Sequence, residues 1–285
     1  MDIRQYTSAT EVLEKVGKCL MEREAENNLP LGLLHRLKKN EEKRVKYEPG
    51  KEPFIAVVEE NDGKLGMIMV QTPPDNLVIC GKEEFIKPIV KWLCKKGIDL
   101  PGVVGCKPII DKFVEAWVKE TNKTPEVFMR QLIYRLDELQ QIPRQKGRLC
   151  YATEDDLTLV TYWTQQFHEE ALEPIDKKRA EEFVKNEIKN NTIFLWRTEN
   201  CTPVSMAKRA RETKNGVVIN LVYTPDEYKR QGYATTCVAA LSEWLLKEGF
   251  KFCSLYTDLD NPTSNSIYTK IGYKPIAESV EYRFI

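Results

Sequence analysis

The sequence predicts an α/β protein made of two domains, each with a mixed sheet flanked by helices. The chain has 285 residues, whereas a single domain usually has about 100–200. Short apolar runs of strand length alternate with longer segments of helical spacing along the whole chain. The order strand–turn–strand–turn–strand, helix, strand, helix, strand occurs twice, which predicts similar domains at 1–141 and 142–285 and an old duplication.

The first half starts with a charged segment and continues with short strands. Its first fifty residues are rich in charge and have a helical pattern. Apolar runs bounded by turn residues, such as Asn61-Asp62-Gly63 and Pro73-Pro74, then predict strands. Apolar residues that recur every three or four positions predict helices. The predicted strands are 54–59, 65–70, 77–80, 102–105 and 128–139, and the predicted helices are 85–96 and 109–121.

The second half repeats this order after a polar connector. The connector, Ile142–Gly147, contains Pro and Gly and is the best candidate for a domain boundary. Thr153 and Asp156 form a capping box with Asp in place of the usual Glu or Gln, which predicts a helix start. The predicted strands are 149–152, 193–196, 204–211, 217–223, 252–257 and 277–284, and helices are predicted at 157–167, at 177–189, after Gly232, and at 264–271.

Composition argues against several classes of function. Lys and Arg number 43 and Asp and Glu also number 43, which argues against a surface built for nucleic acid or an anionic membrane. With only His35 and His168 present, a three-histidine zinc site is impossible, and we expect no metal. The eight cysteines form no C-x-x-C pair, the N-terminus does not have the pattern of a signal peptide, and no apolar run reaches the ~20 residues of a membrane helix. We therefore expect a soluble, cytoplasmic protein with no nucleic-acid or membrane partner.

The most informative segment follows the strand predicted at 217–223. There Lys229-Arg230-Gln231-Gly232-Tyr233-Ala234 runs into a helix. The N–H groups in the first turn of a helix are free and lie at the positive end of its dipole, and Gly232 lets the backbone approach a ligand closely. These features predict a phosphate or pyrophosphate site, with a cationic loop that only joins strand to helix as the alternative. The Walker A motif and the three-glycine dinucleotide motif are both absent.

Two segments together resemble the GNAT superfamily of acyl-CoA-dependent N-acyltransferases. Lys229–Ala234 is similar to the family's Q/R-x-x-G-x-G/A motif, and it follows a strand that ends in Leu221–Pro225. Asn261–Tyr273 is similar to the second cofactor motif, an Asn followed by a helix that carries a Tyr and then by Gly and an aromatic residue. The resemblance is good over 145–285 and faint over 1–144.

The resemblance implies two GNAT-like domains, each with a central, mostly antiparallel sheet, and acetyl-CoA as the acyl donor. The backbone of 221–223 would splay from the neighbouring strand and hydrogen-bond the pantetheine arm like an added strand, and the N–H groups of 230–235 would hold the pyrophosphate. Lys229 stands where the family usually has Gln or Arg, so it keeps a charge but loses the planar fork of Arg. Tyr268 would protonate the departing thiolate, with a core-edge aromatic as the alternative reading. The implied cofactor-binding residues are Leu221, Val222, Tyr223, Lys229, Arg230, Gln231, Gly232, Tyr233, Ala234, Thr235, Asn261, Asn265 and Tyr268.

The general base stays open at this point. Many family members have a carboxylate on the strand that here offers Asn220, which can position a water but cannot take a proton. Glu170 is the candidate base that we carry forward, and a solvated surface carboxylate is the alternative. Further candidates of the same kind are Glu169, Asp258 and His168.

The first domain lacks the cofactor motif. Gly81–Ile86 contains two acids where the loop should be, and these would repel pyrophosphate, so we expect a degenerate copy. The sequence therefore predicts an N-acetyltransferase that transfers an acetyl group to a primary amine by direct attack, on a small amine or amino-acid-type acceptor, as a monomer or homodimer. The alternatives are a catalytically weak acyl-CoA-binding protein or sensor, an N-acyltransferase for a longer acyl-CoA, and an interaction module.

Overall fold

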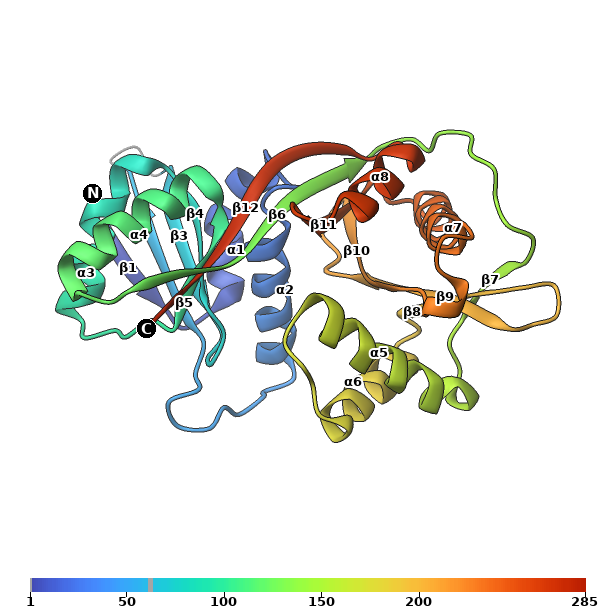
Figure 1. The fold of residues 1–285 in the computed structure, drawn as a ribbon. Helices are drawn as coiled ribbons and strands as arrows, with labels where there is room; N and C mark the ends of the chain where they lie inside the picture. The colour runs from blue at the N-terminus through green and yellow to red at the C-terminus, as the bar shows by residue number, and fades with distance from the viewer. Residues whose placement is uncertain (1, 61–63) are drawn as a thin grey trace. The chain divides into compact units, whose positions relative to one another are not determined.

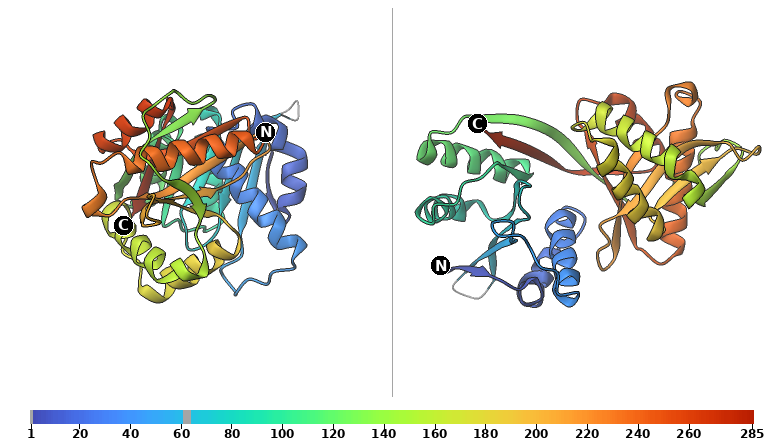
Figure 2. Two further views of the ribbon diagram at one scale, coloured as in Figure 1. Left: turned by 90° about the vertical axis from the view of Figure 1, so that its right-hand side faces the viewer. Right: turned by 90° about the horizontal axis from the view of Figure 1, so that it is seen from below.

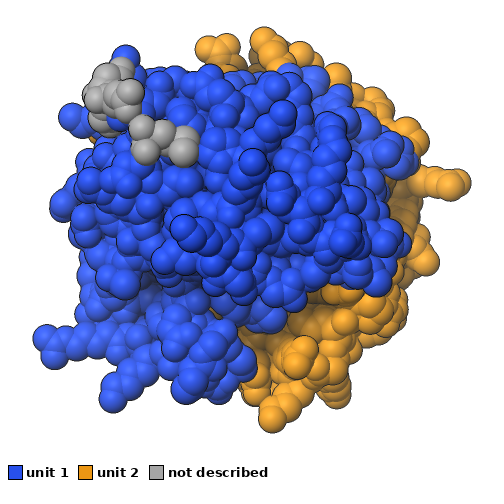
Figure 3. Space-filling model, turned by 90° about the vertical axis from the view of Figure 1, so that its left-hand side faces the viewer, with its two compact units in different colours: residues 1–133, 257–260, 275–285 blue, residues 134–256, 261–274 orange. Residues whose placement is uncertain are grey.

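The computed structural model describes residues 2–60 and 64–285, so the turn predicted at Asn61-Asp62-Gly63 lies outside the described residues. The chain forms two compact units (Figure 3). The expected ranges 1–141 and 142–285 are each continuous in sequence, whereas the two units are not, because the C-terminal strand belongs to the first unit. Unit 1 contains 1–133, 257–260 and 275–285, and unit 2 contains 134–256 and 261–274.

Unit 1 is a mixed sheet with helices on both faces (Figures 1 and 2). Its strand order is β1-β2-β3-β4-β5-β12-β6. The pair β4–β5 is parallel, whereas β1–β2, β2–β3, β3–β4 and β5–β12 are antiparallel. The elements are β1 (Asp2–Tyr6), α1 (Ala9–Met21), α2 (Asn28–Glu42), β2 (Phe54–Glu59), β3 (Leu65–Gln71), β4 (Leu77–Gly81), α3 (Ile86–Lys95), β5 (Gly102–Cys106), α4 (Lys107–Thr121), β6 (Pro125–Leu136) and β12 (Lys274–Phe284).

The sequence-based expectation was wrong for β1, because the first fifty residues were expected to be helical. β1 is a short edge strand, paired with β2 from Asp2↔Glu59 to Tyr6↔Ile55. Only Tyr6 of its five residues is buried. A solvated edge strand of this kind carries no apolar alternation, which is the signal that predicts strands.

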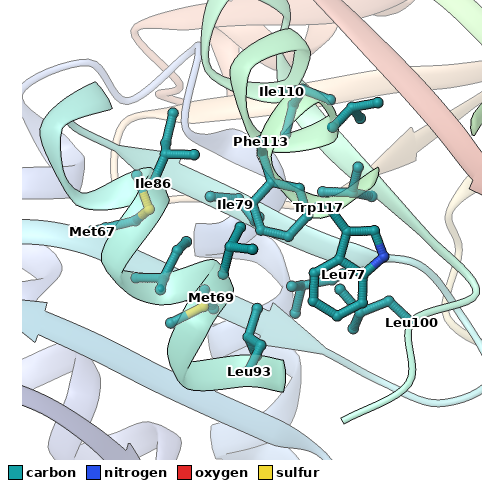
Figure 4. Close-up of a cluster of buried hydrophobic side chains, with 14 of the residues drawn as sticks. Met67, Met69, Leu77, Ile79, Ile86, Leu93, Leu100, Ile110, Phe113 and Trp117 are labelled. Atoms are coloured by element: carbon teal, nitrogen blue, oxygen red, sulfur yellow. The ribbon is translucent and has the colours of Figure 1, made fainter. Parts of the chain in front are cut away.

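The core of unit 1 follows the alternation of side chains along its strands. Ile55 and Val57 of β2 pack with α1 and α2, whereas Ala56 and Val58 pack with α3 and α4 on the opposite face. Figure 4 shows the second cluster, in which Trp117 of α4 lies near Leu77 and Leu100 among other buried side chains. Both faces of the sheet are therefore buried, which agrees with the apolar character of its inner strands.

The predicted repeat of elements is present in the second half of the chain, although β12, its last strand, lies mostly in unit 1. Unit 2 contains the other elements of that repeat. Its sheet has the order β11-β10-β9-β8-β7, in which only β10 and β11 are parallel. The capping box is confirmed, since the Thr153 N–H donates to Asp156 Oδ2 at 2.9 Å before α5 begins. The elements are β7 (Arg148–Tyr151), α5 (Leu157–Ala171), α6 (Lys177–Lys189), β8 (Ile193–Arg197), β9 (Pro203–Ala210), β10 (Gly216–Tyr223), α7 (Tyr233–Lys247), β11 (Phe252–Asp258) and α8 (Pro262–Ile271).

None of the helices within 2–60 and 64–285 combines the length and the apolar composition that crossing a membrane requires.

Candidate functional site

The central feature of unit 2 is the place where β10 leaves its neighbour β11. The two strands pair in parallel only from Gly216↔Phe252 to Val218↔Ser254. On its other side β10 stays paired with β9 as far as Tyr223, with a bulge after Asn220. Leu221 has a φ of 51°, which turns the backbone within this bulge. The last residues of β10 therefore present an unpaired backbone edge toward the β11 side, where an extended chain of amide groups can add as a strand.

The end of β10 is held by buried hydroxyl groups. Ser205 Oγ on β9 donates to the carbonyl of Tyr223 at 3.2 Å and lies 2.9 Å from Thr224 Oγ1. Ser205 is fully buried and Thr224 is 8% exposed. These bonds fix the strand where it turns toward the loop that leads to α7. Sequence reasoning missed Ser205 because a single Ser within an apolar strand carries no distinctive pattern.

The loop between β10 and α7 ends in a helix start with free backbone donors. Arg230 and Gly232 have φ values of 62° and 83°, so left-handed residues alternate with others just before the helix. In the described part of the chain no acceptor pairs with the N–H groups of residues 233–235, whereas the Thr236 N–H donates to the carbonyl of Gly232 at 3.0 Å. Donors that converge at the positive end of a helix dipole suit an anion, and phosphate above all.

Lys229 does not offer a free charge to such an anion. Its Nζ lies 3.0 Å from Glu170 Oε1 and 2.7 Å from Asp226 Oδ1, and 5.9 Å from the centroid of the Tyr223 ring. Burial lowers the pKa of Lys229, but the hydrogen bonds to Asp226 and Glu170 outweigh it and hold the pKa above its usual value. Two carboxylates therefore already balance the cation that was expected to contact phosphate. Arg230, by contrast, is exposed, and no ion pair involves it among the described residues.

The candidate base Glu170 is paired with Lys229, so its carboxylate is not free of other partners. Glu170 lies at the C-terminal end of α5, and both of its carboxylate oxygens accept from Lys229 Nζ, at 3.0 and 3.1 Å. Asn220 lies opposite Lys208 of β9, and its side chain is exposed and makes no hydrogen bond within the part of the chain that is described. Neither residue is joined to Tyr268 by a hydrogen bond within that part.

Tyr268 lies on α8 in a group of tyrosines. Its ring is 8% exposed and is 6.2 Å from that of Tyr134 and 6.0 Å from that of Tyr273, centroid to centroid. Burial raises the pKa of Tyr268 to about 12. The phenol therefore stays protonated at neutral pH and can act as a donor in a site with little water. The Tyr273 and Ser242 hydroxyls, 2.8 Å apart, tie the end of α8 to α7.

The two asparagines of the second motif each have a structural partner, one on α8 and the other on β6. Asn261 is the N-cap of the helix, since its Oδ1 accepts from the Ser264 N–H at 3.0 Å. Asn265 Oδ1 accepts from the Tyr134 hydroxyl at 3.3 Å. The amide nitrogen of Asn261 is still able to donate to a ligand, but its oxygen is used by the helix.

One polar residue near the helix start was not predicted. Gln145 belongs to the connector before β7, and its N–H donates to Thr236 Oγ1 at 3.0 Å. A Cβ on Gly232 would lie 3.3 Å from the Gln145 side-chain nitrogen. No sequence signal could have found this residue, because its contact with α7 joins positions 91 residues apart.

Within 2–60 and 64–285, no three His, Cys, Asp or Glu side chains lie together in a way that could hold a metal ion. The features that carry the candidate site of unit 2 are the backbone donors of α7, the unpaired edge of β10 and the buried phenol of Tyr268.

Known proteins are similar to this chain in part of its sequence and in its fold. Residues 201–283 match the sequence model of a family described as FR47-like protein. No curated protein matches the sequence significantly. The fold is similar to that of a Drosophila protein, with 12% identity and a TM-score of 0.69; the match covers 99% of this chain and 98% of that chain. It is also similar to that of a GCN5-related N-acetyltransferase from Sphaerobacter thermophilus, with 15% identity and a TM-score of 0.63; the match covers 99% of this chain and 95% of that chain. It is also similar to a tandem GNAT protein from the clavulanic acid biosynthesis pathway (10% identity, 99% of this chain and 98% of that chain, TM-score 0.57). At identities this low, the likeness to these structures shows a shared fold and no more.

Proposed function

We propose that this chain, which has the GNAT acetyltransferase fold in tandem, transfers an acetyl group from acetyl-CoA to a primary amine, and that unit 2 carries the reaction. The observation that carries this proposal is the parting of β10 from β11 beside the free N–H groups of α7. The strand edge at 221–223 suits the amide-containing pantetheine arm, and the helix start suits the diphosphate. Both parts of the donor then have a partner of matching chemistry within one unit.

The proposed reaction is direct attack of the neutral amine on the thioester carbonyl. The new bond joins the amine nitrogen to the carbonyl carbon, and the carbon–sulfur bond breaks when the tetrahedral intermediate collapses. The Tyr268 hydroxyl donates to the departing sulfur and regains its proton from solvent, while the amine loses its proton to a base or to water. A phenol whose pKa is about 12 is present in its donating form throughout the neutral range.

The base in this proposal is a water chain or an exposed carboxylate. Asn220 is exposed near the parting of the strands and is suited to position a water. Glu170 serves mainly to hold Lys229, because both of its oxygens accept from that cation. The acceptor that we propose is a small amine or an amino-acid-type amine, since the features of this site select the donor and impose nothing larger on the acceptor.

A second candidate function is an acyl-CoA-binding protein without turnover. It is favoured by two observations: Asn220 stands on the strand where a carboxylate base would be expected, and Glu170 is already paired with Lys229. Such a protein would keep the donor site and lose the chemistry.

Calorimetry and a thiol-release assay test both candidates on the full chain. Titration with acetyl-CoA should give one site per chain and a raised thermal midpoint, since a ligand at 100 times its Kd stabilises a fold by ~2.7 kcal/mol. Release of CoA thiol over a panel of primary amines should then identify acceptors. Binding without amine-dependent release would support the second candidate, and no binding would exclude both.

A further inference from the structure

The connector before β7 reaches the start of α7 through a single residue, Gln145. Its backbone N–H donates to Thr236 Oγ1. Thr236 is the fourth residue of α7 and is only 1% exposed. The anchor is therefore a buried hydroxyl on a rigid element. It fixes the Gln145 backbone at the end of α7 that has free N–H groups.

The side chain of Gln145 lies over Gly232. A Cβ on Gly232 would be 3.3 Å from Gln145 Nε2 and 3.9 Å from its Cγ. Gly232 has a φ of 83°, so this position accepts a side chain only with strain, and the space beside it belongs to Gln145. The carboxamide is exposed and has no hydrogen-bond partner among the described residues. It is a pair of free N–H donors held at the mouth of the proposed diphosphate site.

We propose that Gln145 is a diphosphate-binding residue of this site, and that its carboxamide N–H groups donate to the same phosphate oxygens that the first turn of α7 holds. This inference rests on the proposed function, because the ligand is the acyl-CoA of that proposal. Gln145 thereby supplies a phosphate contact that was expected from Lys229, whose charge is balanced by Asp226 and Glu170. A neutral donor adds to the cradle without a further cation.

The role predicts a definite order among substitutions at this exposed position. Q145A removes the donor and should weaken binding about tenfold, because hydrogen bonds to charged groups contribute about 1.5 kcal/mol or more. Q145E keeps the shape but brings a negative charge to the phosphates, and it should bind more weakly than Q145A. Q145K keeps a donor and adds a positive charge, so it should bind at least as tightly as the wild-type chain.

The test is calorimetric titration of the full chain with CoA and with 3′-dephospho-CoA. The loss in Q145A should be the same for both ligands, since they share the diphosphate and differ only in the 3′-phosphate. Q141A is the matched control, because Gln141 is an exposed glutamine of the same connector. It should bind both ligands as the wild-type chain does, and thermal midpoints of all variants should agree.

Three results would overturn the inference. If Q145A bound CoA as well as or better than the wild-type chain, the carboxamide would only cover Gly232. If the loss appeared with CoA but vanished with 3′-dephospho-CoA, the contact would be with the 3′-phosphate. If the wild-type chain failed to bind CoA at all, the proposed function would fall together with this inference, and the first two results are distinguished from that case by normal wild-type binding.

Discussion

The strand–turn–helix segment of unit 1, from β4 to α3, and that of unit 2, from β10 to α7, occupy the same place in the order of elements but differ in two physical respects. β4 is paired with β5 from Leu77↔Val103 to Ile79↔Gly105 and with β3 up to Gly81. The following N–H, from Lys82, still donates to Gly66 on the β3 side at 2.8 Å. β10 also pairs with β11 over three residues, but it continues for five residues beyond Val218, whereas β4 continues for only two beyond Ile79.

The helix starts also differ in charge. Glu83 and Glu84 precede α3 in its 3₁₀ turn, whereas Lys229 and Arg230 precede α7. Acidic groups are favourable at a helix N-terminus because they satisfy its dipole from within the chain. Unit 1 thus places negative charge of its own just before the helix, and unit 2 places positive charge there and leaves the first N–H groups of α7 without an acceptor among the described residues. Under the proposed function, one scaffold therefore carries an anion site in unit 2 and none in unit 1, depending on strand pairing and on a few local charges.

The largest predicted effect concerns the helix after β11. In unit 1 the corresponding helix, α4, carries Phe113 and Trp117, which stack 5.7 Å apart in the core. In unit 2, α8 carries the phenol of Tyr268. Y268F removes the hydroxyl alone, so kcat should fall about 1000-fold, within the range of general acid catalysis, while the KM for acetyl-CoA changes little. Steady-state kinetics with an identified acceptor measures this.

Y162F is the control for that substitution, because Tyr162 of α5 is 55% exposed. Its kcat should equal that of the wild-type chain. The pH profile gives a second check: burial raises the pKa of Tyr268 to about 12, so the acid stays protonated and kcat should not fall on its account as pH rises to about 10, the ordinary pKa of a phenol. An unchanged kcat in Y268F would remove this residue from the role of acid.

The next largest effect comes from giving unit 2 the charge of unit 1. T235E places a carboxylate in the first turn of α7, among the free N–H groups. Binding of CoA should weaken about 100-fold through repulsion of the diphosphate. The fold should not suffer, since an acid there is favourable by ~0.3–1 kcal/mol.

T235Q separates charge from bulk in that experiment. It has nearly the same size as T235E, and calorimetry should find its affinity for CoA within about threefold of the wild-type value, since one added neutral side chain changes binding by about a neutral hydrogen bond or less. If T235E and T235Q bound CoA equally, charge at the helix start would not be the difference that separates the two units.

A smaller effect distinguishes the two cations before α7. R230A should weaken CoA binding about fivefold, because Arg230 is exposed and its charge is not balanced by a carboxylate in the described part of the chain. K229Q should change binding less than about twofold, because Asp226 and Glu170 already balance Lys229. Isothermal titration at low and high salt measures both, and a larger loss in K229Q than in R230A would contradict this assignment.

The sequence was sufficient where the signal is local. Gly232 before α7 and Asn261 before α8 mark helix starts, and the structure has both as N-caps. Long-range pairing left no such signal: the Glu170–Lys229 contact joins residues 59 apart, and β12, near the end of the chain, pairs with β5 of the same unit 1. The parting of β10 from β11 was expected only through the family resemblance, because hydrogen bonds that a strand does not make leave no pattern in its residues.

The smallest predicted effect is on the unit 1 side and tests whether charge alone separates the units. E83Q with E84Q removes both acids before α3, and the number of CoA sites per chain, measured by calorimetry, should stay at one. β4 stays paired with β3 up to Gly81 and extends only two residues beyond its last partner on β5, so removing the acids releases no further strand edge for a pantetheine arm. Loss of the exposed Glu83–Lys112 ion pair should cost less than about 1 kcal/mol of stability. A second CoA site in E83Q/E84Q would mean that the acids, and not the strand pairing, keep unit 1 from binding the donor.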